Sequence, residues 1–320
     1  MTYRPLGASG LMVSAVGLGC NNFGSRVDEA GTREVVHAAL DAGITLFDTA
    51  DSYGGTAGRS EELLGRVLGT RRAEVVLATK FGSDLGGVNG PDWGARGSRR
   101  YIRTAVEASL RRLGTDWIDL YQLHWPDPVT PMDETLAALD EIVREGKVRY
   151  IGHSNLSAWH AVDADWIARS NGTTPFISAQ NEYSLLNRSV EAELVPACEH
   201  LGLGLLPYFP LASGLLTGKY RRGAAAPQGT RLASVPSRLE AADFDRIEAL
   251  ERFAADRGIG LLDVGIGGLA AQPAVASVIA GATKPDQVRA NAAAGAWAPT
   301  AEDLVLLDEI APAPQASGRR

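Results

Sequence analysis

Four reactive side chains follow three consecutive apolar segments in the first half of the chain. Asp48 lies at the end of the first segment and Tyr53 shortly after it, Lys80 directly follows the second, and His124 ends the third. Short apolar runs rich in Val, Ile and Leu predict strands that are covered on both faces. In a barrel of parallel strands the carboxyl ends of the strands meet at one rim. We therefore expect an acid, a phenol, an amine and an imidazole to lie close together.

This combination of groups suits the reduction of a carbonyl. A free tyrosine has a pKa of about 10 and is a weak acid at neutral pH. Because an adjacent ammonium stabilises the phenolate, Lys80 is expected to lower the pKa of Tyr53, with Asp48 holding the lysine protonated. Tyr53 then donates a proton to a carbonyl oxygen, which His124 orients. No side chain supplies a hydride, so the set implies a nicotinamide cofactor.

The elements that must position these groups alternate between strands and helices. About eight alternations favour an α/β fold of the closed (β/α)8 TIM barrel type over an open doubly wound sheet. A β-hairpin over residues 3–13 precedes the first strand and is expected to cap the barrel. Residues 213–238 are expected to form a long loop. Residues 1–320 are predicted to form one domain.

The pattern also gives the expected bounds of these elements. Strands are expected over 14–19, 45–49, 75–79, 118–124, 148–154, 176–181, 203–208 and 276–279. Helices are expected over 32–41, 60–68, 99–113, 133–145, 157–169, 189–200, 241–256 and 285–294.

Charge and composition exclude several classes of function. The 320 residues carry a net charge of −7, which disfavours nucleic acid as a partner. The N-terminus does not resemble a signal peptide, and no stretch approaches the roughly 20 apolar residues of a membrane span, so a cytoplasmic protein is expected. The two cysteines, Cys20 and Cys198, have no metal-type spacing, and no bound metal is expected. The sequence does not indicate an oligomeric state.

Three motifs resemble the signatures of the aldo-keto reductase family. Residues 43–54, Gly-Ile-Thr-Leu-Phe-Asp-Thr-Ala-Asp-Ser-Tyr-Gly, resemble the first signature, and residues 113–124, Leu-Gly-Thr-Asp-Trp-Ile-Asp-Leu-Tyr-Gln-Leu-His, resemble the second. Leu-Ala-Thr-Lys at 77–80 resembles the lysine strand. The resemblance covers nearly the whole chain. It implies that the acid, tyrosine, lysine and histidine named above are catalytic, and that the chain is an NADP(H)-dependent oxidoreductase acting on small aldehydes and ketones.

The resemblance also implies residues for the cofactor. In the family, the residues matching Ser154, Asn155 and Gln180 hydrogen-bond the nicotinamide amide, and the one matching Tyr208 stacks on its ring. The segment that resembles the pyrophosphate cradle contains Leu211, Ala212, Gly214, Leu215 and Lys219. The segment that resembles the adenosine clasp contains Gly281, Thr283, Lys284, Gln287 and Asn291.

The adenosine segment favours NADP(H) over NAD(H). Gln287 and Asn291 are one helical turn apart and can face the same adenine. Thr283 and Lys284 precede a helix whose N-terminus, together with the ammonium, favours a 2′-phosphate.

Substrate contacts and departures from the family lie in the loops and in one helix. Asn22, Phe23, Trp93 and Trp125 are expected to line the substrate region, and the aromatic content suggests small aldehydes, ketones or sugar-like carbonyls. Residues 263–269, Asp-Val-Gly-Ile-Gly-Gly-Leu, replace the family's usual Ala-Leu-x-Trp-Leu. Because each glycine costs a helix about 1 kcal/mol relative to alanine, a weak or locally irregular helix is expected there.

Three other functions fit parts of the pattern. A Schiff-base aldolase on the same barrel would use Lys80 as its nucleophile. A metal-dependent hydrolase would use His124 and His153, although the chain has no HxH or HExxH spacing. A non-catalytic NADP(H)-binding redox sensor or regulatory subunit would keep the fold with little turnover, and the intact set of four reactive residues argues against it.

Overall fold

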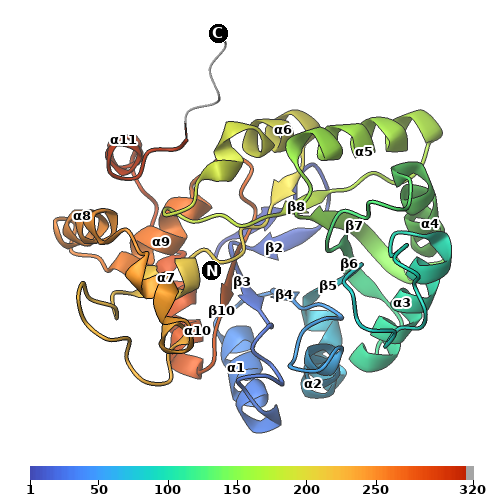
Figure 1. Cartoon of the computed structure of the whole chain (residues 1–320), viewed down its shortest axis with the longest axis horizontal. Helices are drawn as coiled ribbons and strands as arrows, with labels where there is room; N and C mark the ends of the chain where they lie inside the picture. Colours follow the sequence, from blue (N-terminus) through green and yellow to red (C-terminus); the bar gives the residue numbers. More distant parts are fainter. Residues whose placement is uncertain (315–320) are drawn as a thin grey trace.

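The computed structural model describes residues 1–314 and contains a sheet of eight parallel strands that curls into a barrel (Figure 1). The strands are β3 (Val16–Gly19), β4 (Leu46–Asp48), β5 (Val76–Phe81), β6 (Ile118–Leu123), β7 (Val148–Ser154), β8 (Ser178–Gln180), β9 (Gly204–Leu205) and β10 (Val278–Gly281). From β3 to β9 each strand pairs with the next strand in the chain, and β10 pairs with β3. The Leu205 amide donates to the carbonyl of Ala274 (2.7 Å), and the Ala276 amide donates to the carbonyl of Leu205 (2.9 Å). These bonds close the barrel, and the expected (β/α)8 fold is confirmed.

Helices surround the barrel on its outside (Figure 1). They are α1 (Glu29–Asp41), α2 (Arg59–Leu68), α3 (Arg99–Leu113), α4 (Met132–Arg144), α5 (Ala158–Asn171), α6 (Leu194–Leu201), α7 (Pro236–Glu240), α8 (Phe244–Ala255), α9 (Leu261–Ala270), α10 (Pro285–Ala294) and α11 (Ala301–Ile310). Side-chain caps set some of their starts: Asp28 accepts from the amide of Gly31 before α1, and Ser98 from that of Tyr101 before α3. No helix among residues 1–314 has both the length and the apolar content needed to cross a membrane.

An N-terminal hairpin, β1 (Tyr3–Pro5) and β2 (Met12–Ser14), packs against one end of the barrel. Leu6 and Val13 are fully buried in one cluster with strand residues such as Leu120. Gly7 has a φ of +60°, and a Cβ at this position would clash with the carbonyl oxygen of Gly202. Only glycine lets the turn approach the chain this closely. The expected hairpin is present.

The glycine-rich segment 263–269 lies in α9, a continuous and buried helix, so the expectation of a weak or irregular helix is wrong. A Cβ on Gly267 would lie 2.7 Å from the carbonyl oxygen of Trp297, and one on Gly265 would lie 3.2 Å from Cδ2 of Leu211. The missing side chains let α9 pack closely against its neighbours. This packing outweighs the low helix propensity of glycine.

Several other elements also differ from the expected ones; for example, β9 is shorter than the expected strand 203–208, and β10 is shifted relative to the expected strand 276–279. The expected loop 213–238 contains η3 (Ala212–Thr217), η4 (Arg231–Ser234) and α7, and the expected helix 241–256 begins only at Phe244. Residues 189–200 divide into η2 (Ser189–Ala192) and α6, and α11 was not expected. Five of these elements (η2, η3, η4, α6 and α7) have eight residues or fewer, and periodicity over so few residues does not fix where an element begins or ends.

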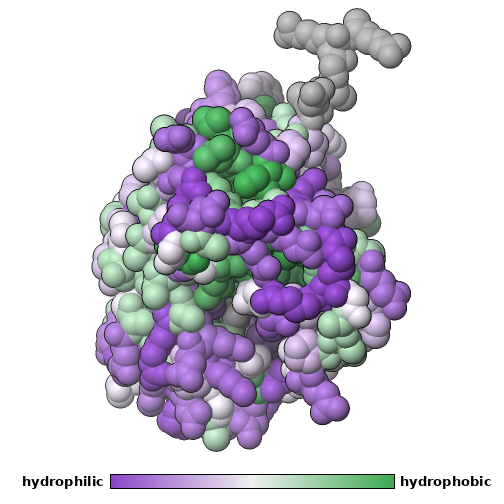
Figure 2. Space-filling view, turned by 90° about the vertical axis from the view of Figure 1, so that its left-hand side faces the viewer, coloured by the Kyte–Doolittle hydropathy of each residue, from purple (hydrophilic) through white to green (hydrophobic). Residues whose placement is uncertain are grey.

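The side of the molecule that carries α7 and α8 is mostly hydrophilic, with a hydrophobic area towards its upper part (Figure 2). Segment 213–238 belongs to this side and approaches the barrel rim (Figure 1). The carboxyl ends of the strands and this segment together position the site described next.

Candidate active site

Asp48 and Lys80 form a buried ion pair at the ends of β4 and β5. Lys80 Nζ donates to Asp48 Oδ2 over 2.6 Å and to the carbonyl oxygen of Thr49 over 2.8 Å. The lysine is 0% exposed. The other carboxylate oxygen of Asp48 accepts from the side-chain amides of Gln180 (2.9 Å) and Gln122 (3.3 Å). Both ions therefore have the hydrogen bonds that buried charges require.

The charge of Lys80 is maintained by its surroundings. Burial lowers the pKa of the ammonium, but Asp48 and Tyr53 raise it by more, so that the net shift is upward. The side chain is a fixed positive charge beneath the rim rather than a free amine.

Tyr53 lies over this charge. Its ring centroid is 5.0 Å from Lys80 Nζ, and the ring meets that of His124 edge-on at 5.7 Å. Burial raises the pKa of Tyr53 above its ordinary value, and Lys80 counteracts this only in part. Lys80 thus lowers the pKa as expected, but the loss of water around the phenol outweighs this effect and the net shift is upward. Tyr53 is a protonated phenol at neutral pH.

His124 follows β6 and completes the group. Its carbonyl oxygen accepts from Asn155 Nδ2 over 2.9 Å, and its ring stacks on that of Trp125 at 5.7 Å. Burial, assisted by the charge of Lys80, lowers the pKa of His124 to about 3. The imidazole is therefore neutral at physiological pH. The structure thus brings the four predicted catalytic residues together at one rim.

A cavity of about 1110 Å³ extends from this group along the rim. Tyr53, His124 and Trp125 line one part of it, and Gln287 and Asn291 of α10 line another. Three residues that line it, Asn155, Phe209 and Ser213, have positive φ without being glycine. Such backbone strain is concentrated at functional sites.

The residues predicted for the nicotinamide end form one hydrogen-bonded group. Tyr208 donates its hydroxyl to Asn155 Oδ1 (2.9 Å), Asn155 Nδ2 also donates to Ser154 Oγ (3.0 Å), and Ser154 Oγ donates to the carbonyl oxygen of Gln180 (2.7 Å). Gln180 Nε2 is used by Asp48 and Gln122, which leaves its Oε1 as an acceptor. All four predicted residues line the cavity.

The residues predicted for the phosphate and adenosine parts divide into two sets. Those that line the cavity are Leu211, Gly214, Lys219, Gly281, Thr283, Lys284, Gln287 and Asn291. Ala212 and Leu215 are not among the residues that line it; both lie in η3, an irregular 3-10 segment in which only some residues face the cavity. Gln287 Oε1 accepts from both the amide (2.8 Å) and the hydroxyl (3.1 Å) of Thr283.

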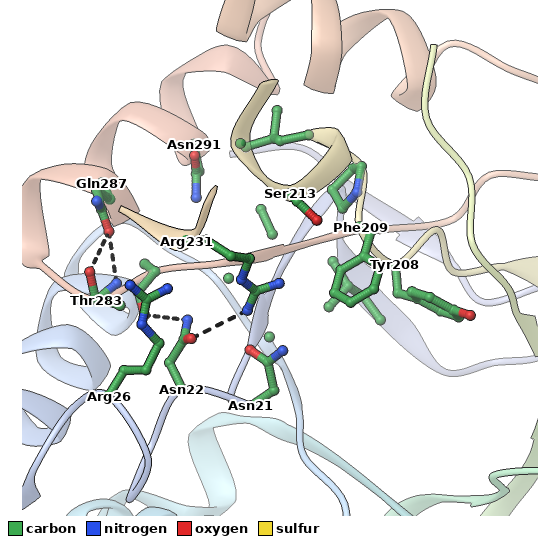
Figure 3. Close-up of a pocket in the computed structure, with 18 of the residues that line it drawn as sticks. Asn21, Asn22, Arg26, Tyr208, Phe209, Ser213, Arg231, Thr283, Gln287 and Asn291 are labelled. Atoms are coloured by element: carbon green, nitrogen blue, oxygen red, sulfur yellow. Dashed lines mark hydrogen bonds between the residues drawn. The ribbon is translucent and has the colours of Figure 1, made fainter. Parts of the chain in front are cut away.

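Two arginines that were not predicted also line the cavity. Figure 3 shows Arg26 and Arg231 approaching from different segments, with Asn22 near both. Arg26 Nη2 donates to the carbonyl oxygen of Gly229 (3.0 Å), and Arg231 Nη2 to Asn22 Oδ1 (3.5 Å). Burial and the like charges of Arg26 and Arg238 lower the pKa of Arg231. Arg231 lies in segment 213–238, which was expected only as a long loop, and Arg26 lies in the segment after β3.

The wall of the cavity is strongly positive. Arg26, Lys219, Arg231 and Lys284 line it, and none of the four forms a salt bridge within residues 1–314. Asp48 is the carboxylate among the lining residues, and Lys80 already neutralises it. A protein with a net charge of −7 thus concentrates uncompensated cations in one cavity.

The model of the Aldo/keto reductase family matches residues 15–312 of the chain. The chain belongs to the aldo/keto reductase family. It is an oxidoreductase, and members of this family in general use nicotinamide cofactors and small-molecule carbonyl substrates.

Individual members of the family are similar over most of their length. An uncharacterised oxidoreductase of Bacillus subtilis, YrpG, is 39% identical over 98% of this chain and 97% of its own. The L-glyceraldehyde 3-phosphate reductase of Escherichia coli K12 is 34% identical over 91% of this chain and 86% of its own. A probable voltage-gated potassium channel subunit beta of Oryza sativa is 36% identical over 91% of this chain and 90% of its own.

Two of the four substrate residues predicted for this aldo/keto reductase do not line the cavity. Asn22 and Trp125 do. Phe23 is instead fully buried in the hydrophobic core. Trp93 is 74% exposed and stacks on the guanidinium of Arg100, 4.2 Å from the ring centroid. Loop side chains of this kind cannot be placed by spacing alone.

The site also bears on two of the alternative functions. Lys80 has no exposed surface, and its pKa is raised by Asp48 and Tyr53 against the effect of burial; both features disfavour its use as the nucleophile of a Schiff-base aldolase. His153 is fully buried away from the cavity, and residues 1–314 contain no group of three or more His, Cys, Asp or Glu side chains that could hold a metal ion. Cys20 and Cys198 are buried and unpaired.

Proposed function

We propose that this aldo/keto reductase reduces aldehydes and ketones to alcohols with NADPH, and that Tyr53 is the proton donor. The observation that carries the proposal is the buried Lys80–Asp48 pair directly beneath Tyr53, with Lys80 Nζ 5.0 Å from the phenol ring. A fixed positive charge at this place stabilises the phenolate that forms when the proton leaves. A proton donor must carry its proton before the reaction, and the buried phenol of Tyr53 does so at neutral pH.

The positive cavity supports a dinucleotide with phosphates. Arg231 and Arg26 would hold phosphate oxygens, since guanidinium groups bind them in a bidentate way. Lys284 and the N-terminus of α10 would hold a 2′-phosphate. Gln180 Oε1 and the remaining lone pair of Asn155 Oδ1 would accept from the nicotinamide amide. An uncharged ligand would leave the cations of this cavity without a counter-charge.

The residues of the chain divide the remaining chemistry among them. When bound, the nicotinamide cofactor supplies the hydride. His124, neutral because burial holds its pKa at about 3, donates a hydrogen bond to the carbonyl oxygen and orients it. Tyr53 gives its proton to the same oxygen as negative charge develops there. Lys80, held by Asp48, lies close enough to stabilise the phenolate until a proton returns.

The proposal is tested by NADPH oxidation over a panel of aldehydes and ketones with the wild type, Tyr53→Phe and Tyr121→Phe. The Tyr53 substitution is expected to lower kcat by roughly 10²- to 10⁴-fold, the usual contribution of a general acid. NADPH affinity, measured by fluorescence quenching, is expected to stay within about twofold, since the phenol is not assigned to the cofactor.

Tyr121→Phe is the matched control. It also removes a buried hydroxyl, one that has no hydrogen-bond partner within residues 1–314 and does not line the cavity. Its activity is expected to equal that of the wild type. Wild-type turnover of an aldehyde by Tyr53→Phe would show that another group is the donor.

Lys284→Ala and Arg231→Ala distinguish the two kinds of phosphate contact. If Lys284 binds the 2′-phosphate, its loss raises KM for NADPH and leaves KM for NADH nearly unchanged. If Arg231 binds the pyrophosphate, its loss raises both values. Equal changes for both cofactors in Lys284→Ala would remove the 2′-phosphate assignment and, with it, the preference for NADP(H).

A second candidate function is an NADP(H)-binding regulatory subunit with little turnover, which the similarity to probable potassium channel beta subunits favours. The carbonyl panel separates the two, because a sensor binds NADPH but oxidises it with none of the compounds.

We also propose that residues 1–320 form one domain, supported by the family match over 15–312; residues 315–320 lie outside the described residues. A cytoplasmic location is proposed from the two unpaired, buried cysteines.

A further inference from the structure

Ser83 lies two residues beyond β5 and lines the cavity beside the catalytic group. Gly82, which precedes it, has a φ of +99°, and a Cβ there would lie 3.2 Å from Leu123 Cδ1. The glycine conformation turns the chain back towards β6 directly after the strand that carries Lys80. Ser83 therefore faces the end of β6 instead of continuing the direction of β5.

The hydroxyl of Ser83 contacts the catalytic histidine. Ser83 Oγ lies 3.0 Å from His124 Nδ1. The backbone of His124 is fixed by a bond from its amide to the carbonyl oxygen of Phe81 (2.8 Å) and by the bond from Asn155 to its own carbonyl oxygen. With Nδ1 occupied by Ser83, Nε2 is the ring nitrogen that remains for a substrate.

Because His124 is neutral, its contact with Ser83 determines which ring nitrogen carries the hydrogen. Burial and the charge of Lys80 lower its pKa to about 3, so the ring is neutral and has one donor and one acceptor nitrogen. Which nitrogen carries the hydrogen depends on the partner of the other one. Serine is able to donate or accept, but only donation to Nδ1 leaves a hydrogen on Nε2.

We propose that Ser83 is a positioning residue that donates its hydroxyl hydrogen to Nδ1 of His124 and so holds the ring as the Nε2–H tautomer. The role in catalysis rests on the proposed carbonyl reduction: a carbonyl oxygen has no hydrogen to give, so it can be oriented only by a nitrogen that carries one. The opposite arrangement, with Nδ1 donating to Ser83, would present a lone pair to the substrate oxygen and repel it.

The test combines kinetics with ¹⁵N NMR of the histidine rings in the wild type, Ser83→Ala and Ser83→Thr, with the His124 signals identified by their loss in His124→Asn. Ser157→Ala is a matched control, because Ser157 Oγ lies 2.9 Å from His160 Nδ1 at the start of α5, away from the cavity. It removes a serine–histidine contact of the same kind without touching His124.

In the wild type and Ser83→Thr, the His124 spectrum is expected to show a hydrogen on Nε2 alone. Ser83→Ala is expected to show both tautomers and a kcat lowered by roughly 2- to 12-fold, which corresponds to the loss of one hydrogen bond between neutral groups. KM for NADPH should not change, and threonine should restore kcat. Ser157→Ala should alter the His160 signals alone.

Three results would overturn the proposal: a wild-type spectrum with the hydrogen on Nδ1, an unchanged tautomer and kcat in Ser83→Ala, or a lower kcat without any change in the His124 ring signals. If the wild type reduces no carbonyl compound, the proposed function fails. The NMR comparison of Ser83→Ala with the wild type still decides the tautomer in that case, so the two failures can be told apart.

Discussion

His153 is a second neutral imidazole, and it makes the stability of this protein depend on pH. The side chain lies in β7, is 0% exposed, and packs edge-on against Phe176 with ring centroids 5.3 Å apart. Neither ring nitrogen has a hydrogen-bond partner within residues 1–314. Burial, with a smaller contribution from His160, lowers the pKa of His153 to about 3. The folded chain therefore resists protonation here, while the unfolded chain does not.

The size of the effect follows from the two pKa values. Because the pKa of His153 is lower in the folded chain, its contribution to stability is complete above about pH 6.5 and is lost as the pH falls towards 3. At pH 5 the unfolded chain gains about 2 kcal/mol from protonation at this one position, since the pH lies about 1.5 units below the ordinary pKa of histidine and each unit is worth about 1.4 kcal/mol. This value requires only that the folded pKa lie well below 5.

The substitution His153→Phe tests this number, because it keeps an aromatic ring against Phe176 and removes the titrating group. We expect the free energy of unfolding, measured in urea at pH 8 and pH 5, to fall by about 2 kcal/mol less in the variant than in the wild type. His124 titrates in the same direction in both proteins, and its contribution cancels. His200→Phe, which replaces an exposed imidazole at the end of α6, should behave as the wild type does. Equal losses in His153→Phe and the wild type would refute the reasoning.

Two further outcomes can be checked with simple measurements. Gly267→Ala should destabilise the protein by about 1–3 kcal/mol in thermal unfolding, because the new Cβ would lie 2.7 Å from the carbonyl oxygen of Trp297. Gly268→Ala is the control: its Cβ would meet ordinary contacts from 3.5 Å, so the substitution should be neutral or stabilising by up to about 1 kcal/mol. The kcat for carbonyl reduction should stay level from about pH 6 to pH 9, because Tyr53 stays protonated and His124 stays neutral over this range. An inflection near pH 7 would contradict these two protonation states.

The barrel and its catalytic rim were predictable because both depend on local sequence. Buried parallel strands form nearly continuous apolar runs, and β7 was predicted with the bounds that it has in the structure. Once the strands are known, the residues directly after them must share one rim. Asp48, Lys80 and His124 were therefore located by their distance from a strand end, without knowledge of any contact.

The two arginines proposed to contact phosphate could not be predicted in this way. Arg26 and Gly229 meet across 203 residues of sequence, and both lie in loops. Phe23 and Trp93, by contrast, were expected to line the cavity and do not. Phe23 is buried in the core, and Trp93 is exposed at the surface. The irregular helix expected at 263–269 failed because propensity is a local property, whereas close packing against Trp297 decides this segment.

The net rise in the pKa of Tyr53 changes the role that we propose for Lys80. An ammonium that lowered the resting pKa would leave part of the enzyme as phenolate, which cannot donate a proton. Burial instead raises the pKa of the phenol, so that the proposed donor is protonated before the reaction. In the proposed reaction, the charge of Lys80 then acts mainly on the phenolate formed during proton transfer, at a place where low exposure to water strengthens the interaction. The same burial that holds the proton on Tyr53 thus strengthens the attraction between Lys80 and the anion that forms when the proton leaves.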